Sequence, residues 1–220
     1  MVNIKDRVRS VLKELPQGVE LVAAAKSRNA VEIEEAVEAG IRIIGENYIQ
    51  EAEEVYPQIR ERVKWHFIGK LQRNKVKKAV KLFDMIETVD SEDLAREIDA
   101  RAFSIGKVMD VLIEMNSGDE EQKSGVFADD VEDLIRNMAV LKNLKVRGIM
   151  TMGPLSDDLE ELRPYFKTTK DKFEHIRSAD IPGVEMKYLS MGMSASYRIA
   201  IEEGANLVRI GTGIFGERNN

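Results

Sequence analysis

Short runs of apolar, often β-branched residues recur along the chain, and a charged amphipathic segment follows most of them. Eight such runs can be recognised, at residues 19–25, 41–45, 64–68, 85–89, 107–115, 145–150, 187–189 and 207–210. Several are apolar at both alternating positions, which is typical of parallel strands buried on both faces. The pattern therefore predicts eight strands of a parallel sheet.

The segments between these runs have the spacing of amphipathic helices. Over residues 30–39 the apolar side chains form one stripe opposite glutamates, and Gly40 suits the end of a helix. Ser91 and the acids after it favour a helix N-terminus. A long helical segment is predicted over residues 156–177, and a further helix over residues 6–14 precedes the first strand.

Eight strands that alternate with helices match a (β/α)₈ barrel, or TIM barrel, at the small end of its size range. The chain has 220 residues and 43% hydrophobic content, which suits one sizeable core, so we expect a single domain over residues 1–220. We expect the N-terminal helix to cover the barrel where the last helix usually lies. An open doubly wound sheet is the alternative, although no G-x-G-x-x-G motif follows the first strand.

Composition excludes several classes of site and partner. The formal net charge of −6 offers no global basic field for nucleic acid or anionic membranes. The chain has no cysteine and only two histidines, His66 and His175, so we expect no disulfide, thiolate nucleophile or histidine-rich metal centre. No apolar run approaches the roughly 20 residues of a membrane span, and the N-terminus lacks a signal peptide's apolar region. We expect a cytoplasmic protein.

The first candidate for chemistry is Lys26, which ends the first strand-like run. In a barrel, the loops after the carboxyl ends of the strands build the site. A lysine beside a buried strand would be partly desolvated, and its amine would be free to attack an aldehyde. A solvated loop lysine is the alternative.

Two small-residue turns follow the last two predicted strands, at residues 190–194 and 209–213. Glycine lets the backbone approach a ligand, hydroxyls and an arginine can donate to it, and a helix N-terminus after the first turn would add further donors. Barrel phosphate sites often use these two loops. Tight turns and a helix cap would explain the same residues without a ligand. Together with Lys26, the turns favour a phosphorylated aldehyde held as a Schiff base.

Two further polar residues lie at or near predicted strand ends. Asn47 follows the second strand, where it could hydrogen-bond a ring hydroxyl or cap the next helix. His66 lies within the buried pattern of the third strand, where a satisfied core histidine is favoured over a catalytic base.

These residues together resemble the pyridoxal phosphate homeostasis protein family, short single-domain relatives of the barrel domain of alanine racemase. The resemblance runs from about residue 20 to residue 218. Its carriers are Ala24-Ala25-Lys26-Ser27, Gly45-Glu46-Asn47-Tyr48, Trp65-His66-Phe67-Ile68-Gly69 with Leu71-Gln72-Arg73-Asn74-Lys75, Lys123-Ser124-Gly125, Ser190-Met191-Gly192-Met193-Ser194, and Arg209-Ile210-Gly211-Thr212 with Phe215-Gly216. One departure is Asn29, where the family commonly has a proline soon after the lysine.

The resemblance implies pyridoxal 5'-phosphate (PLP) as the cofactor. Lys26 matches the lysine that forms the Schiff base, Arg209 matches an arginine that contacts the phosphate or the ring nitrogen, and Asn47 lies where the family places a polar residue near the ring. The positions that match the phosphate-binding turns are Ser190, Gly192, Gly211 and Thr212.

The resemblance also implies a protein of intracellular PLP homeostasis or carriage rather than an efficient enzyme. In the racemases that the resemblance points to, two barrel-containing chains form a dimer, and a second domain supplies a tyrosine base. An open site without such a second base supports proton transfer on both faces of the substrate poorly. An arginine at the ring nitrogen would also weaken the electron sink. The alternatives are a PLP-dependent amino-acid racemase or decarboxylase of this barrel type and, more remotely, a Schiff-base aldolase. We expect a monomer, with apo forms of PLP-dependent enzymes as candidate recipients.

Overall fold

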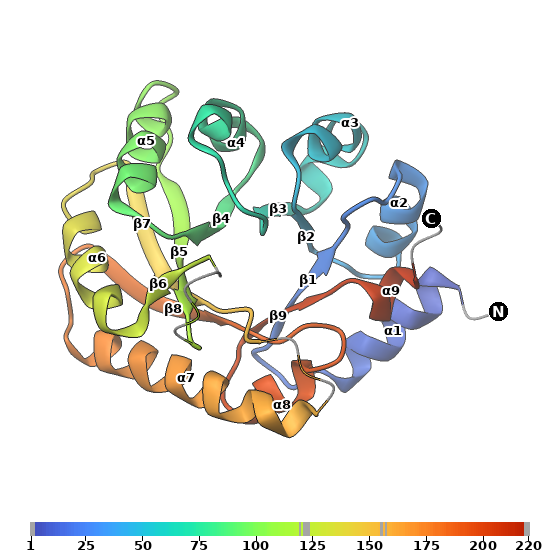
Figure 1. The fold of residues 1–220 in the computed structure, drawn as a ribbon. Helices are drawn as coiled ribbons and strands as arrows, with labels where there is room; N and C mark the ends of the chain where they lie inside the picture. Colours follow the sequence, from blue (N-terminus) through green and yellow to red (C-terminus); the bar gives the residue numbers. More distant parts are fainter. Residues whose placement is uncertain (1–2, 119, 121–123, 155, 157, 218–220) are drawn as a thin grey trace.

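The computed structural model describes residues 3–118, 120, 124–154, 156 and 158–217. Its strands form one parallel sheet in the order β4-β3-β2-β1-β9-β8-β7-β5, and pairing between β4 and β5 closes this sheet into a barrel (Figure 1). The strands of the barrel are β1 (Glu20–Ala24), β2 (Ile43–Glu46), β3 (Lys64–Phe67), β4 (Met85–Val89), β5 (Met109–Asn116), β7 (Leu144–Met150), β8 (Val184–Ser190) and β9 (Leu207–Ile210). All eight predicted strands and the TIM barrel are confirmed.

Helices surround the barrel on its outside (Figure 1). The α-helices are α1 (Ile4–Glu14), α2 (Ala30–Glu38), α3 (Ile49–Ile59), α4 (Val76–Leu82), α5 (Glu92–Phe103), α6 (Val131–Met138), α7 (Arg163–Ser178), α8 (Tyr197–Glu202) and α9 (Thr212–Phe215). Short 3₁₀ turns are η1 (Arg60–Arg62), η2 (Arg73–Lys75), η3 (Ala128–Asp130) and η4 (Leu159–Leu162). A two-residue strand, β6 (Val126–Phe127), pairs with the end of β5 and was not predicted. No helix of the described residues is long and apolar enough to cross a membrane.

The N-terminal helix takes the place expected for it. Helix α1 packs against α2 and α9, and Figure 1 shows it on the outside of the barrel near β1 and β9. Its last residue, Glu14, accepts hydrogen bonds from Tyr197 and Arg198 of α8. Helix α9 after β9 has only four residues, so α1 supplies most of the cover on this side.

Asn29, the departure from the family pattern, has a structural role. Its side chain accepts a hydrogen bond from the Glu32 backbone N–H, and the Glu32 side chain accepts one from the Asn29 backbone N–H. This reciprocal capping box satisfies donors at the start of α2. The asparagine therefore begins the helix by capping it, where a proline would begin it by fixing φ.

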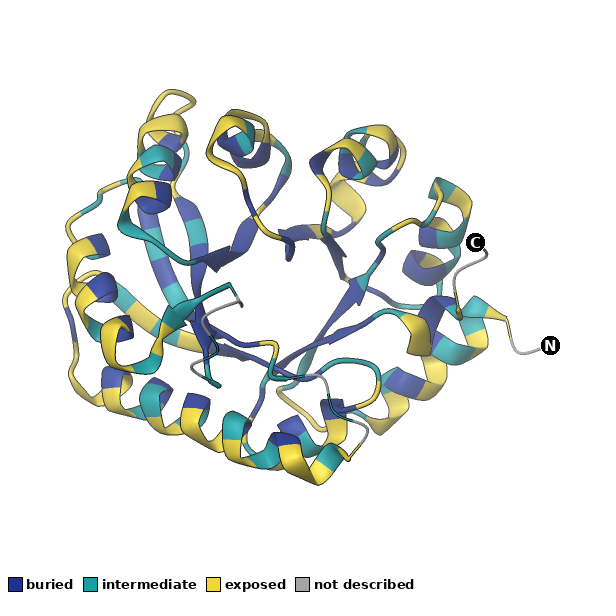
Figure 2. Cartoon of the chain, viewed as in Figure 1, coloured by how far each residue is buried: buried dark blue, intermediate teal, exposed yellow. Residues whose placement is uncertain are grey.

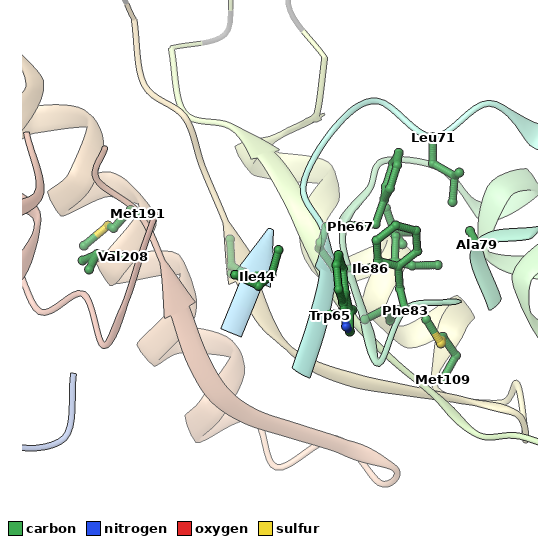
Figure 3. Close-up of a cluster of buried hydrophobic side chains, with 14 of the residues drawn as sticks. Ile44, Trp65, Phe67, Leu71, Ala79, Phe83, Ile86, Met109, Met191 and Val208 are labelled. Atoms are coloured by element: carbon green, nitrogen blue, oxygen red, sulfur yellow. The ribbon is translucent and has the colours of Figure 1, made fainter. Parts of the chain in front are cut away.

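The barrel divides the apolar residues into two cores. The larger core lies between the sheet and the helices, and Figure 2 shows buried residues on the strands and on the inward faces of the helices. Part of it is the packing of Trp65, Phe67, Phe83, Ile86 and Met109 in Figure 3. The smaller core fills the barrel interior, with one residue from each strand or its end: Val22, Ile43, Ile68, Met85, Leu112, Met150, Tyr188 and Leu207.

This inner core fixes which side chains face the site. Side chains alternate between the two faces of a strand, so positions two and four residues after an interior residue also face the interior. Val22 and Ala24 belong to the inner core, and Lys26 continues their phase at the carboxyl end of β1. By the same rule Ser190 follows Tyr188, and Arg209 follows Leu207.

Candidate functional site

The backbone after Lys26 is held in an unusual conformation. Ser27 has φ of +61°, in the left-handed region that a residue with a side chain seldom adopts. Its N–H donates to Glu51 Oε2 of α3 at 2.7 Å, and the Arg28 N–H donates to the Ala25 carbonyl at 2.9 Å. These contacts stabilise a sharp turn directly after the lysine, so Lys26 stands at the end of β1 on a braced segment.

The Lys26 side chain is half-buried at the mouth formed by the carboxyl ends of the strands. Its Nζ lies 5.3 Å from the centroid of the Tyr48 ring, which follows β2. Among the described residues, Nζ has no hydrogen-bond or ion-pair partner. An amine that contacts an aromatic face and lacks a protein counter-charge is available to a ligand.

The two predicted turns lie side by side and are joined by Ser194. Ser194 Oγ accepts hydrogen bonds from the backbone N–H groups of Gly211 at 3.1 Å and of Gly213 at 3.2 Å. Gly192 has φ of +89°, and a Cβ there would lie 2.6 Å from the Ala200 Cβ. We call the backbone of residues 192–194 and 211–213 the cradle. Two of its N–H groups converge on one oxygen, as they would on an anion.

The cradle adjoins the end of the strand that carries Lys26. Strands β1 and β9 are paired, with Ala23 opposite Ile210, and a Cβ at Gly211 would lie 3.2 Å from the Ala24 carbonyl oxygen. Lys26 and the cradle therefore share one mouth of the barrel. Thr212, within the cradle, begins α9 and is exposed. The helix predicted after the first turn, α8, begins only at Tyr197. The convergent donors instead belong to Gly211, the N-cap of the four-residue helix α9, and to Gly213 in its first turn.

Arg209 and Ser190 lie below this mouth, inside the barrel. Arg209 is 4% exposed; its Nη1 donates to Ser190 Oγ at 2.5 Å and its Nη2 donates to the Thr151 carbonyl at 2.7 Å. Burial lowers the pKa of Arg209, and the negative charges of Glu87 and Glu114 oppose that shift. The Ser190 hydroxyl also donates to Glu87 Oε2 at 2.7 Å. Both side chains are thus engaged in the interior rather than in the cradle.

His66 is a satisfied core histidine, as favoured from the sequence. It is 3% exposed, and its Nδ1 lies 2.7 Å from Glu87 Oε1. Glu87 was not singled out in the sequence, although an acid within the apolar run of β4 is a detectable signal. Burial raises the pKa of Glu87, but the hydrogen bond and charge of His66, the charge of Arg209 and the Ser190 hydrogen bond together lower it below its usual value.

Asn47 lies at the mouth, but it does not cap a helix. The N-cap of α3 is Tyr48, and no side-chain capping bond forms there. The capping alternative for Asn47 is therefore wrong. Its amide stays half-buried near the end of β2, and the close approach of Gly69, whose Cβ would lie 2.4 Å from the Asn47 carbonyl oxygen, fixes the backbone at this point.

Two further carboxyl groups at strand ends were not predicted from the sequence. Burial, with help from the charge of Glu51, raises the pKa of Glu46 to about 8. Burial and the charge of Asp90 raise the pKa of Glu114 to about 7. Glu114 lines a cavity of about 280 Å³ that also includes Thr151 and Met193, next to Arg209 and the cradle. The mouth thus holds an anion cradle, the Lys26 amine and space beside them. Lys123, part of one family block, lies outside the described residues.

Comparison with known proteins gives a consistent result. The family model for the alanine racemase N-terminal domain matches residues 1–219. The chain is 38% identical to a pyridoxal phosphate homeostasis protein of Aquifex aeolicus, over 99% of each chain, and 37% identical to one of Schizosaccharomyces pombe, over 97% of this chain and 91% of that one.

Solved structures agree with this. PipY of Synechococcus elongatus without PLP superimposes with a TM-score of 0.92 at 33% identity, over 97% of this chain and 100% of that one. PipY with PLP bound gives a TM-score of 0.90 at 32% identity over the same shares. Alanine racemase of Clostridium difficile gives 0.81 at 17% identity, over 99% of this chain and 57% of that one, which shows a shared fold alone.

Proposed function

The chain belongs to the pyridoxal phosphate homeostasis proteins, within the wider family of the alanine racemase N-terminal domain, and we propose that it binds PLP as a Schiff base on Lys26 and acts in PLP homeostasis or carriage. The observation that carries this proposal is the Lys26 amine, which has no hydrogen-bond or ion-pair partner within the described part of the chain and lies at the same mouth as the cradle. PLP needs both an amine for its aldehyde and donors for its phosphate.

The residues at the mouth fit such a group. The Ser194 oxygen already receives the Gly211 and Gly213 N–H groups, which supports phosphate binding there by Gly192, Ser194, Gly211 and Thr212. A side chain at Gly192 would collide with α8, and one at Gly211 would crowd the Ala24 carbonyl at the end of β1. Tyr48 contacts the Lys26 amine from the end of β2. Tyr48 and Asn47, which precedes it, are proposed to contact the ring side.

Arg209 is proposed to face the ring nitrogen. The cradle already provides backbone donors for the phosphate, whereas Arg209 and Ser190 lie one layer deeper in the barrel interior. Ser190 accordingly supports Arg209 in this proposal, and Ser194 takes the place at the phosphate that the family resemblance implied for Ser190. When bound, PLP supplies an electrophilic carbon and an electron-accepting ring. A fixed positive charge at the ring nitrogen disfavours its protonation and weakens the ring as an electron sink.

This electrostatic arrangement favours a binding and carrying role over efficient turnover. The homologous proteins at 32–38% identity are named for PLP homeostasis, while the alanine racemases share 16–17% identity and only the fold. A racemase function is therefore not favoured. We further propose a monomeric cytoplasmic protein with one domain, which exchanges PLP with apo forms of PLP-dependent enzymes.

The proposal is tested by adding PLP to the purified protein. Absorbance near the edge of the visible range should develop, and borohydride should make the bound cofactor resistant to dialysis. Deuterium exchange at the α-carbon of alanine or serine should stay far below the turnover of typical enzymes, about 10 s⁻¹. Exchange at that rate would contradict the carrier function, and a protein that takes up no PLP would contradict the binding itself.

A further inference from the structure

A chain of buried hydrogen bonds runs down the barrel interior from Arg209. Arg209 donates to Ser190 Oγ, the Ser190 hydroxyl donates to Glu87 Oε2, and Glu87 Oε1 lies 2.7 Å from His66 Nδ1. All four side chains are at most 4% exposed. They come from β9, β8, β4 and β3, so the chain crosses the barrel rather than following its rim.

The direction of each hydrogen bond is determined by the charge of Glu87. Contacts with His66, Arg209 and Ser190 hold the pKa of Glu87 below its usual value despite burial, so this group is a carboxylate and can only accept. Ser190 must then donate to Glu87, which leaves its lone pairs for Arg209. The His66 ring must carry a proton on Nδ1. Each hydrogen bond of the chain therefore has a single donor and a single acceptor, and the orientation of the Ser190 hydroxyl depends on Glu87.

His66 cannot reach the cofactor mouth itself. It is paired with Met85, the first residue of β4, and it lines a cavity of about 310 Å³ together with Glu20, Lys64 and Asp84. Those residues lie at the amino ends of β1, β3 and β4, so the cavity opens at the opposite end of the barrel from Lys26. Any influence of His66 on the cofactor must pass through Glu87 and Ser190.

We propose that His66 and Glu87 are positioning residues for Arg209, which hold its guanidinium through Ser190 in the orientation that meets the PLP ring. This inference rests on the proposed function. The guanidinium has two described hydrogen-bond anchors, the Ser190 hydroxyl and the Thr151 carbonyl. Only the Ser190 anchor leads to a counter-charge, since Glu87 Oε2 lies 4.0 Å from Arg209 Nη1.

A purely stabilising role explains this chain less well. Buried ion pairs are often replaced by apolar side chains of similar volume without loss of stability, because their desolvation cost offsets their attraction. Apolar residues from every strand fill much of the barrel interior. Orientation of the Arg209 guanidinium at the level of the PLP ring explains why all four side chains of this hydrogen-bonded chain are polar.

Two substitutions of His66 separate positioning from packing. In His66→Asn, the amide nitrogen is the same number of bonds from the backbone as Nδ1 and can donate to Glu87, whereas His66→Leu fills space but cannot donate. We expect PLP binding to weaken about tenfold in His66→Leu and by no more than about twofold in His66→Asn. Equal loss in both variants, or no loss in either, would overturn the inference. If His66→Leu does not fold, Ser190→Ala is measured in its place. Wild-type PLP affinity in Ser190→Ala would then overturn the inference.

A second readout does not depend on PLP. In the apo protein, the Arg209 guanidinium protons should exchange slowly with solvent in the wild type and in His66→Asn, so their ¹⁵N–¹H signals should be sharp. In His66→Leu the same signals should be broadened. Unchanged signals in His66→Leu would refute the positioning role even if no PLP bound. A wild type that fails to take up PLP would instead refute the proposed function, so the two failures are distinguishable.

Discussion

The Glu46 carboxyl predicts a pH dependence of stability that a single substitution should remove. Glu46 ends β2, is fully buried, and neither of its carboxyl oxygens has a hydrogen-bond partner among the described residues. Burial is the main cause that raises its pKa from 4.5 to about 8, and the charge of Glu51 adds to it. The backbone N–H of Asn47 is near the Glu46 carboxyl but forms no hydrogen bond with it, and it offsets only part of the rise in the Glu46 pKa.

The sign and size follow from proton linkage. Between pH 4.5 and about 8 the unfolded chain has lost the Glu46 proton while the folded protein keeps it. The folded state is therefore favoured at low pH, and this contribution is lost as the pH rises through that window. At about 1.36 kcal/mol for each pKa unit, the loss amounts to on the order of 5 kcal/mol by pH 8.

The substitution Glu46→Gln keeps the shape and removes the titration. Urea unfolding of the apo protein at several pH values from 5 to 8 should show the variant gaining stability relative to the wild type, by at most about 5 kcal/mol at the upper end. Glu61→Gln is the matched control, since the Glu61 side chain is 85% exposed and should leave the pH slope unchanged. Parallel curves for the wild type and Glu46→Gln would refute the assignment of Glu46 as a buried, unpaired acid.

Three substitutions at the mouth give further predictions. Lys26→Ala should abolish the borohydride-fixed cofactor while the melting temperature of the apo form stays close to that of the wild type; retained fixation would contradict the role of Lys26. Ser194→Ala removes the acceptor that joins the two turns, so it should cost about 1 kcal/mol in urea unfolding and weaken both PLP and inorganic phosphate binding; unchanged phosphate affinity would argue against the cradle. Arg209→Gln removes the Arg209 charge beside the buried Glu87 and leaves His66 as its remaining charged neighbour, so the variant should lose up to about 3–5 kcal/mol of stability. Arg209→Lys should fold better but still bind PLP weakly; equal unfolding curves for these two variants would exclude that charge effect.

The barrel and its mouth could be predicted because local features of the sequence specify them. Parallel strands buried on both faces need continuous apolar runs, and all eight runs became strands. Lys26 and the glycine turns lie at strand ends, and the closure of the barrel brings all such ends to one mouth. The position of Asn47 at this mouth followed in the same way.

The interior contacts could not be predicted, because they join residues far apart in sequence. Ser190 and Glu87 are separated by 103 positions, and only barrel closure brings them together. Similarly, Ser194 looked like a turn residue until the next turn placed two N–H groups on its oxygen. The depth of Arg209, one layer below the mouth, depends on strand register that the apolar pattern does not give.

In the proposed function, the Lys26 amine and the cradle bind one PLP molecule together. The most direct measurement is borohydride reduction of the PLP-loaded protein, followed by digestion and mass mapping of the modified peptide. We expect one pyridoxyl phosphate adduct per chain, located on Lys26, which is suppressed when excess inorganic phosphate competes for the cradle. An adduct on other lysines, or none at all, would contradict it.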